Sequence, residues 1–391
     1  MNEENIIVSK QASKQASKQA SKQASKQASK QASKQASKQA SKQASKQASK
    51  RISWLDVAKG FGILFIVWGH VLRSGQFRMY LYTFNVTLFF FLLGYTFKCD
   101  ESLKEFFKKR FLRTMIPYYI WSVVSILIFL LMGKYVSFDV SNASMSLWKN
   151  LIGMLYANSR TIYMRWNLPL WFIPCMNLTL VLVWLLERVR QDTVKTNRVK
   201  CRAVFCLILI LVGLVIQKKL TDIKFPFQFE SAVLMAAFVE LGLIFKECKI
   251  VERVNKDDLY ILVCALLLGT GLFFSKINGV AEVRSSNYGK YPILFVITAC
   301  AMTGFVVLIS YKIGGNFILE KLGQSSLPIL LMHKFPILFF QSVLPKTKFL
   351  LEKPDTIDGF LCSFVVTCVS IGICYMGKNI IRSVMPIIIG E

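Results

Sequence analysis

The sequence is poor in charged residues and contains only two histidines. Charged side chains make up 18% of its 391 residues, whereas hydrophobic side chains make up 54%. Soluble domains carry about 25% charged residues. This composition therefore excludes an ordinary water-soluble enzyme and indicates a chain that is solvated largely by lipid.

Paired cysteine motifs are missing as well. Ten cysteines are present, but no two of them have the CxxC spacing of a metal or redox site. We therefore expect neither a disulfide framework nor a bound metal, and we expect the cysteines to act as small hydrophobic residues.

Acidic residues are also scarce. The chain has 22 acidic and 49 basic residues, which gives a net charge of +27. Eleven of the basic residues are lysines of an N-terminal repeat, and most of the others lie in short loops between hydrophobic segments. Membrane proteins distribute positive charge in this way. We therefore expect membrane lipid as a partner and no nucleic acid.

The N-terminal repeat reads Ser-Lys-Gln-Ala ten times over residues 9–48, followed by Ser49 and Lys50. Lysines four residues apart repel one another along a helix, and the repeat has no hydrophobic face to bury. We therefore expect residues 1–50 to be a disordered tail, followed by a membrane domain at 51–391.

The period of the repeat also suggests how the gene is regulated. The codons AGC-AAG-CAA-GCA encode Ser-Lys-Gln-Ala and consist of three copies of the four-base unit AGCA. Gain or loss of one unit would shift the reading frame and switch the protein off. We therefore hypothesise that expression is phase-variable, which suits a product that alters a microbial surface.

Ten hydrophobic segments after Arg51 approach the twenty or so residues needed to cross a bilayer. They are 54–73, 79–97, 115–133, 168–187, 203–217, 229–245, 259–275, 291–310, 325–343 and 359–380. The predicted fold is an all-α polytopic membrane protein with about ten transmembrane helices. An even number of spans places both termini on one side. The lysine and arginine bias of the loops makes that side the cytoplasm. We expect the protein in a bacterial inner membrane.

The first span contains three ionisable residues, Asp56, Lys59 and His70. Such residues are costly in lipid and usually mark function. At 100° per residue all three share one helical face, and Asp56 and Lys59 are close enough to pair. His70 lies about 16 Å beyond Lys59 along the helix axis. The stripe predicts a catalytic site, with a polar face toward the interior of a helix bundle as the alternative.

Four more residues are candidates for a site. His333 lies in the ninth span after Ser326, where a functional role and a buried structural role fit equally well. Glu240 is a lone acid in the sixth span, and we expect a partner for it on another helix. Trp171 lies close to two prolines, and an interfacial aromatic belt explains it as well as a binding site does.

Arg110 and Arg113 follow two lysines in the loop before the third span. Arginines three apart on a helical turn can present two guanidinium groups to one phosphate-bearing ligand. The alternative is a basic cluster that only sets topology by the positive-inside rule.

These candidates belong to an ordered set of short motifs. The set comprises Asp56-Val-Ala-Lys-Gly60 running to Gly69-His70, Leu88-Phe-Phe-Phe91 with Gly94-Tyr95, Arg110-Phe-Leu-Arg113 before Pro117-Tyr118, Leu170-Trp-Phe172, Asn287-Tyr-Gly289, and Leu322-Gly-Gln-Ser-Ser326 leading to His333. Over residues 51–380 they resemble acyltransferase family 3 of the membrane O-acyltransferases, and within it the fucose 4-O-acetylase-like branch. The resemblance implies O-acetyl transfer from acetyl-CoA to a sugar hydroxyl, with no permanently bound cofactor.

The resemblance also implies roles for individual residues. Members of the family carry an Arg-x10-His pattern in the first span, which is Lys59-x10-His70 here, so the charge is kept but the bidentate fork is lost. The family's Arg-x-x-Arg motif, associated with the acyl donor, matches Arg110 and Arg113. We expect His70 to act as the base, with Asp56 and Lys59 supporting its helix face. The expected acceptor is a surface glycan or a lipid-linked sugar.

Two alternatives to this function stay open. A multispan transporter or flippase for a glycolipid would also have ten spans and intramembrane charges. It would predict halves related as inverted repeats, and no corresponding pair of Gly/Pro-broken segments is present. The second alternative is an acyltransferase that uses another acceptor or a longer acyl group.

Overall fold

The computed structural model describes residues 52–99, 102–132, 146–161, 167–190, 195–220, 222–255 and 258–391. The tail predicted at residues 1–50 lies outside this part of the chain. Within it, all regular structure is helical apart from one isolated bridge between Glu282 and Asn287. The prediction of an all-α fold is therefore confirmed.

Among the described residues, ten helical segments are long and apolar enough to cross a membrane, and each overlaps one of the ten predicted spans. In chain order they are built by α2 (Ser53–Val71), α3 (Gln76–Tyr82) with α4 (Asn85–Thr96), α5 (Leu103–Arg110) with η1 (Phe111–Met115) and α6 (Ile116–Met132), η3 (Leu168–Trp171) with α8 (Phe172–Val189), α9 (Lys195–Lys219), η4 (Pro226–Gln228) with α10 (Phe229–Glu247), α12 (Tyr260–Asn278), α13 (Pro292–Ile313), α15 (Ser326–Met332) with α16 (Lys334–Val343), and α18 (Ile357–Val384). The chain is a multi-pass membrane protein.

Shorter helices lie between these spans. They are α7 (Leu147–Tyr156), α11 (Ile250–Asn255), η5 (Val283–Ser285), α14 (Phe317–Gln324), α17 (Pro345–Leu351) and η6 (Pro386–Ile389). All of these are too short to cross a bilayer alone, so they connect or flank the spans.

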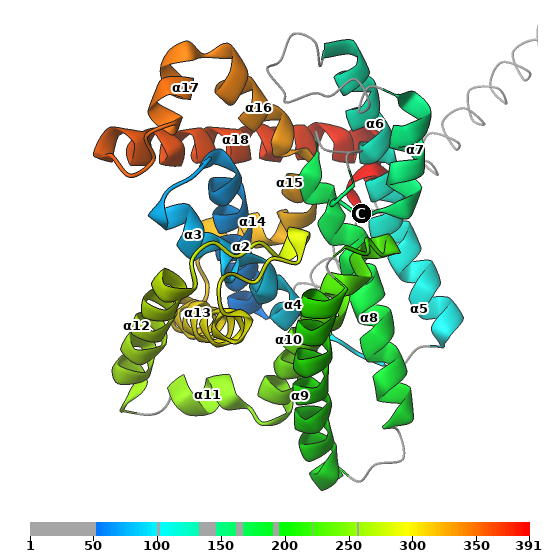
Figure 1. Ribbon diagram of the computed structural model, residues 1–391, viewed down its shortest axis with the longest axis vertical. Helices are drawn as coiled ribbons and strands as arrows, with labels where there is room; N and C mark the ends of the chain where they lie inside the picture. Colours follow the sequence, from blue (N-terminus) through cyan, green and yellow to red (C-terminus); the bar gives the residue numbers. More distant parts are fainter. Residues whose placement is uncertain are drawn as a thin grey trace, which may run out of the picture. The chain divides into compact units, whose positions relative to one another are not determined.

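Helix α2 lies among α4, α13 and α14 (Figure 1). Its contact with α14 brings two backbones together at glycines. A Cβ atom at Gly60 would lie 2.2 Å from the carbonyl oxygen of Leu319, and one at Gly323 would lie 1.9 Å from that of Asp56. Small residues at such crossings allow close packing without a hydrophobic driving force. The α14 contact therefore holds the N-terminal half of α2 in place.

A second pair of glycines joins α4 to α10. A Cβ atom at Gly94 would lie 2.0 Å from the carbonyl oxygen of Val239, and one at Gly242 would lie 2.1 Å from that of Phe91. Because α4 also contacts α2, this crossing connects the first, second and sixth spans. These three spans form the core beside the site described below.

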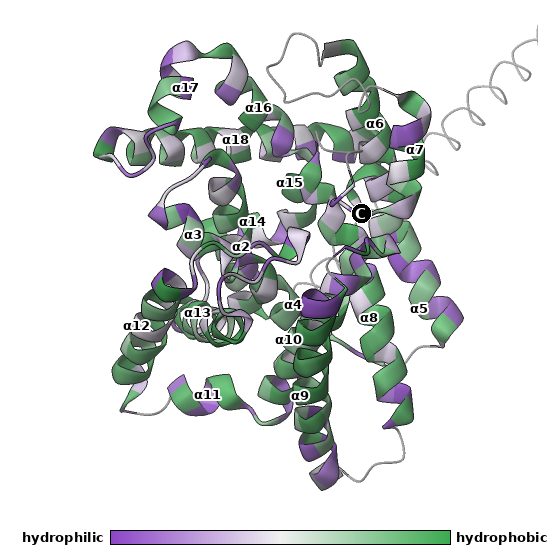
Figure 2. Cartoon of the chain, in the orientation of Figure 1, coloured by the Kyte–Doolittle hydropathy of each residue, from purple (hydrophilic) through white to green (hydrophobic). Residues whose placement is uncertain are grey.

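Helices α9 and α12 lie at the periphery of the bundle. Only 17% of the hydrophobic window of each is buried, compared with 72% for α2. Both are hydrophobic over most of their length (Figure 2). Exposed apolar side chains on the outside of a membrane domain face lipid, so we expect no polar chemistry on the outer faces of these helices.

The third span changes its helical form midway. The N–H of Ile116 donates to the carbonyl of Phe111, five residues back, and residues Phe111–Met115 form a π-helix. Pro117 has no N–H to donate to the carbonyl of Arg113, which favours a local widening of the helix. Such turns recur at functional sites, and this one lies beside the pocket described next.

Candidate active site

Two adjacent pockets lie along one face of α2. The first, the Lys59 pocket, has a volume of about 230 Å³. Its polar lining residues are Lys59, Thr96, Arg110, Thr114 and Ser326, and the rest of its wall is hydrophobic. A mainly apolar cavity with a few convergent polar groups is the usual form of a small-molecule site.

The second pocket, the His70 pocket, encloses about 40 Å³. Its lining includes the polar residues His70, Tyr82, Asn85, Glu282 and Arg284. Trp171 lies in its wall, so the structure brings this predicted residue next to His70.

The two pockets meet at three hydrophobic side chains that line both, Ile66, Phe172 and Leu330. Lys59, Ile66 and His70 recur at intervals of seven and four residues, so they share one helical face. The common face predicted from the sequence therefore carries both pockets, one near each end.

Asp56 and Lys59 lie close together, as their spacing predicted. The Lys59 ammonium is 3.3 Å from Oδ1 of Asp56, and Gln324 donates a hydrogen bond of 3.4 Å to Oδ2. Asp56 is buried but does not line either pocket. We expected this pair to support His70, whereas the structure places Lys59 in the pocket wall that contains Arg110. The reason is the helical rise, which separates Lys59 and His70 by about 16 Å.

His70 is surrounded by residues from α3, from α16 and from the turn between α15 and α16. The Tyr82 hydroxyl is 3.3 Å from Nδ1 of His70, and the ring of His333 is centred 5.3 Å from the His70 ring. Gln341 donates a hydrogen bond of 3.1 Å to the carbonyl of Val71, beside His70. The two histidines of the chain are therefore neighbours, although they come from the first and ninth spans.

His333 is fully buried, and its contacts define its tautomer. Its Nδ1 lies 3.0 Å from the carbonyl oxygen of Ile329. A carbonyl only accepts, so Nδ1 carries the hydrogen and Nε2 of the neutral ring keeps its lone pair. No hydrogen-bond partner lies near this Nε2 within the described part of the chain.

Arg110 and Arg113 have different environments. The Arg110 guanidinium stacks on Phe106 at 4.7 Å from the ring centre and lines the Lys59 pocket. Arg113 is exposed and lines neither pocket. A π-helical turn holds more residues than an α-helical one, so side chains three apart diverge more. The two guanidinium groups are therefore not on one pocket wall.

Glu240 belongs to a separate ion network that joins α8, α9 and α10. Its carboxylate lies 2.5 Å from Nη2 of Arg190 and 3.2 Å from Nη1 of Arg202. Both arginines also pair with Glu187, and Arg202 reaches Glu247 at 3.1 Å. Glu240 lines neither pocket. The sequence indicated that Glu240 needs a partner but not which one, because the two arginines resembled ordinary basic loop residues.

Four polar residues of the His70 pocket were not candidates from the sequence. Tyr82 and Asn85 looked like ordinary polar residues of the second span. Glu282 and Arg284 lie in the loop between α12 and α13, far from His70 in the sequence. The only signal near them was the Asn287-Tyr-Gly289 motif at the end of the same loop.

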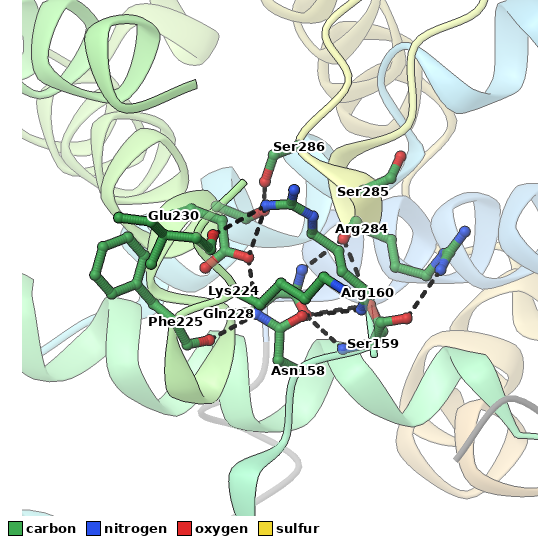
Figure 3. A network of polar contacts seen from close by, with 12 residues as sticks. Asn158, Ser159, Arg160, Lys224, Phe225, Gln228, Glu230, Arg284, Ser285 and Ser286 are labelled. Carbon is green, nitrogen blue, oxygen red and sulfur yellow. Dashed lines mark hydrogen bonds and ion pairs between the residues drawn. The ribbon is translucent and has the colours of Figure 1, made fainter. Parts of the chain in front are cut away.

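The loop between α12 and α13 lies in a network of polar contacts that includes η4, the first turn of α10 and the loop after α7 (Figure 3). Ser231 donates to the carbonyl of Val283 at 2.7 Å, and Gln228 donates to that of Arg284. Beside them, Glu230 accepts from Asn158 at 2.8 Å.

At the end of the loop, Tyr288 is fully buried, and burial raises the pKa of its phenol. The hydroxyl therefore stays neutral. Together these contacts place Glu282 and Arg284 over the His70 pocket on a well-supported loop.

Metal chemistry was not expected from the sequence. Within the described ranges, no group of three or more His, Cys, Asp or Glu residues is arranged to hold a metal ion. What converges at the two pockets is instead a set of cationic, histidine and hydroxyl groups, which suits binding of an anionic ligand and proton transfer.

Comparison with known proteins assigns the family. A family model described as an acyltransferase domain matches residues 52–376. Neither the curated proteins nor the solved structures include a match. The matched region contains all the residues of both pockets, and it implies O-acyltransferase activity, which speaks against a transporter without enzymatic activity. The protein is a multi-pass membrane enzyme that belongs to acyltransferase family 3.

Proposed function

We propose that this enzyme transfers an acetyl group from acetyl-CoA to a hydroxyl of a sugar in a cell-surface polysaccharide or lipopolysaccharide. We place it in the bacterial inner membrane and in the fucose 4-O-acetylase-like branch of the family. The observation that supports this best is the pair of pockets that meet at Ile66, Phe172 and Leu330. One pocket suits an anionic donor, and the other contains a histidine suited to proton transfer.

The Lys59 pocket is the proposed donor site. Lys59 and Arg110 line it together, and two cations favour the phosphate groups of coenzyme A. The hydrophobic remainder of the wall suits the acyl-bearing arm of the donor. This arm would extend along α2 toward His70, across the three shared side chains.

His70 is the proposed general base. With the hydrogen on Nδ1 donated to the Tyr82 oxygen, the Nε2 lone pair is free to take the proton of the sugar hydroxyl. The hydroxyl oxygen then attacks the thioester carbonyl, so that a C–O bond forms and the C–S bond breaks. The coenzyme A thiolate leaves and is protonated.

The topology proposed from the loop charges is consistent with a donor site at Lys59 and a general base at His70. With both termini in the cytoplasm, the Lys59 pocket lies toward the cytoplasmic side, where acetyl-CoA is present, and His70 lies near the outer end of its span. The acetyl group would then cross part of the membrane along α2 while the nucleotide part of the donor stays inside. Labelling of single cysteines in the 74–78 and 98–114 loops with a membrane-impermeant reagent tests this arrangement.

The experiment that tests the function compares surface glycans from cells with and without the gene. Mild base should release acetate from the glycans only when the gene is present. Purified enzyme in vesicles should likewise transfer label from acetyl-CoA to glycan from the deleted strain. Equal acetate in both strains, together with no transfer in vesicles, would refute the proposal.

Phase variation of the gene is a separate part of the proposal. It is supported by the four-residue period of the repeat at 9–48, which a tetranucleotide tract explains. Sequencing the gene tests it. A tract of repeated AGCA units with lengths that differ between colonies is expected, and mixed synonymous codons across the repeat would contradict it.

A further inference from the structure

Glu282 and Arg284 form an ion pair at the His70 pocket. Nη2 of Arg284 lies 2.9 Å from Oε2 of Glu282, and Nε donates a hydrogen bond of 3.2 Å to Oε1. Both side chains are about one-quarter exposed, at 24% for Glu282 and 23% for Arg284. They line the pocket, so their remaining lone pairs and N–H groups are accessible to a ligand at its mouth.

The pair is held in position from both sides. Ser285 donates to Oε2 of Glu282 at 2.8 Å, and Nη1 of Arg284 donates to the carbonyl of Ser159 at 3.3 Å. The backbone of Glu282 is paired with Asn287 through two hydrogen bonds. A binding group fixed before the ligand arrives loses little entropy on binding.

The size of the pocket limits what can enter it. A volume of about 40 Å³ is the space of only a few water molecules. A hydroxyl group fits this volume but a sugar ring does not. The ring must therefore remain at the mouth, between the aromatic wall of Trp171 and Phe172 and the pair of Glu282 and Arg284.

The geometry points to Glu282 and Arg284 as the acceptor-recognition pair, an inference that rests on the proposed function. The Glu282 carboxylate accepts hydrogen bonds from hydroxyls beside the reacting one, and the Arg284 guanidinium donates to an oxygen of the same sugar. Trp171 packs against the apolar face of the ring. The pair thereby selects the sugar and determines which hydroxyl reaches His70.

The test uses the full-length enzyme in vesicles, with acetyl-CoA and glycan from a strain that lacks the gene. Glu282→Gln, which keeps the size of the side chain but removes its charge, should raise the KM for glycan about tenfold or more. The KM for acetyl-CoA should stay within about twofold of wild type. Arg284→Gln should act in the same direction, and either variant should broaden the set of acetylated positions seen by NMR of the product.

Glu352→Gln is the matched control. The carboxylate of Glu352 also pairs with an arginine, Arg73, at 3.6 Å, but neither residue lines the pocket. The Glu352→Gln variant should therefore keep the wild-type KM for glycan and for acetyl-CoA.

An unchanged KM for glycan and an unchanged product in both pocket variants would overturn the inference. So would an equal rise in both KM values, which would indicate a structural role. Absence of transfer by the wild-type enzyme would instead refute the proposed function itself.

Discussion

The Glu240 network and the His70 pocket both place polar side chains within the membrane domain, but their partners differ. In the network each charge faces an opposite one, and Glu240 is entirely buried between Arg190 and Arg202. In the pocket, polar groups from several spans surround an open volume. A polar residue in a span therefore indicates a site for chemistry only when its neighbours leave part of its bonding capacity free.

Replacement of His70 should produce the largest effect on activity. His70→Ala removes the proposed base, and a general base contributes about 10²- to 10⁴-fold to a rate. Transfer of acetyl label to glycan should fall by this factor, while the amount of protein in the membrane stays the same. A variant that keeps more than about a tenth of wild-type activity would contradict the role of His70.

Replacement of Glu240 should affect stability instead of chemistry. Glu240→Ala leaves Arg190 and Arg202 with less opposing charge in a buried site, and breaking such a network costs about 3–5 kcal/mol. The thermal midpoint of the purified protein should fall, whereas the turnover of the protein that remains folded should not change.

Glu247→Ala provides the control for this variant. Glu247 pairs with Arg202 but is 29% exposed, so its loss should lower the midpoint less. If Glu240→Ala kept full thermal stability and lost turnover, the contrast between the network and the pocket would be wrong.

The glycine crossing of α4 and α10 should be sensitive to a side chain of any size. Gly242→Val would force these backbones apart, and overpacking of this kind costs about 1–3 kcal/mol. The measurement is the thermal midpoint of the purified protein, which should fall for Gly242→Val. Gly269→Val on the peripheral helix α12 is the control, because a Cβ atom at Gly269 meets nothing within 4 Å. Equal losses for the two variants would contradict the close approach.

The two arginines of the Arg-x-x-Arg motif should differ, with the smallest effect of this series. Arg110→Gln should raise the KM for acetyl-CoA about tenfold, which corresponds to the loss of one charge-assisted hydrogen bond. Arg113→Gln should raise it by less than threefold, because this side chain is exposed and lines neither pocket. The reverse order would show that the donor binds along the outside of the π-helix.

Hydropathy predicted each of the ten spans found in the described part of the chain, because a membrane helix needs an uninterrupted apolar length that is visible in the sequence. The boundaries at 203–217 and 259–275 were too short, since the helices continue through residues that hydropathy excludes. The relation of Arg110 to Arg113 was harder to predict. The expectation that both guanidinium groups reach one ligand assumed an α-helical turn, and the π-helix at Phe111–Met115 changes that geometry.

By itself, the sequence determined the membrane class, the number of spans and the common face of Lys59 and His70, because these depend on local apolar length and helical period. Only the tertiary structure decided that His333 and Glu282 lie beside His70 and that Arg190 and Arg202 neutralise Glu240. Contacts between spans in lipid depend on small residues and side-chain packing that hydropathy does not contain. Residues far apart in the chain can therefore be assigned to a common site only once the helices are packed.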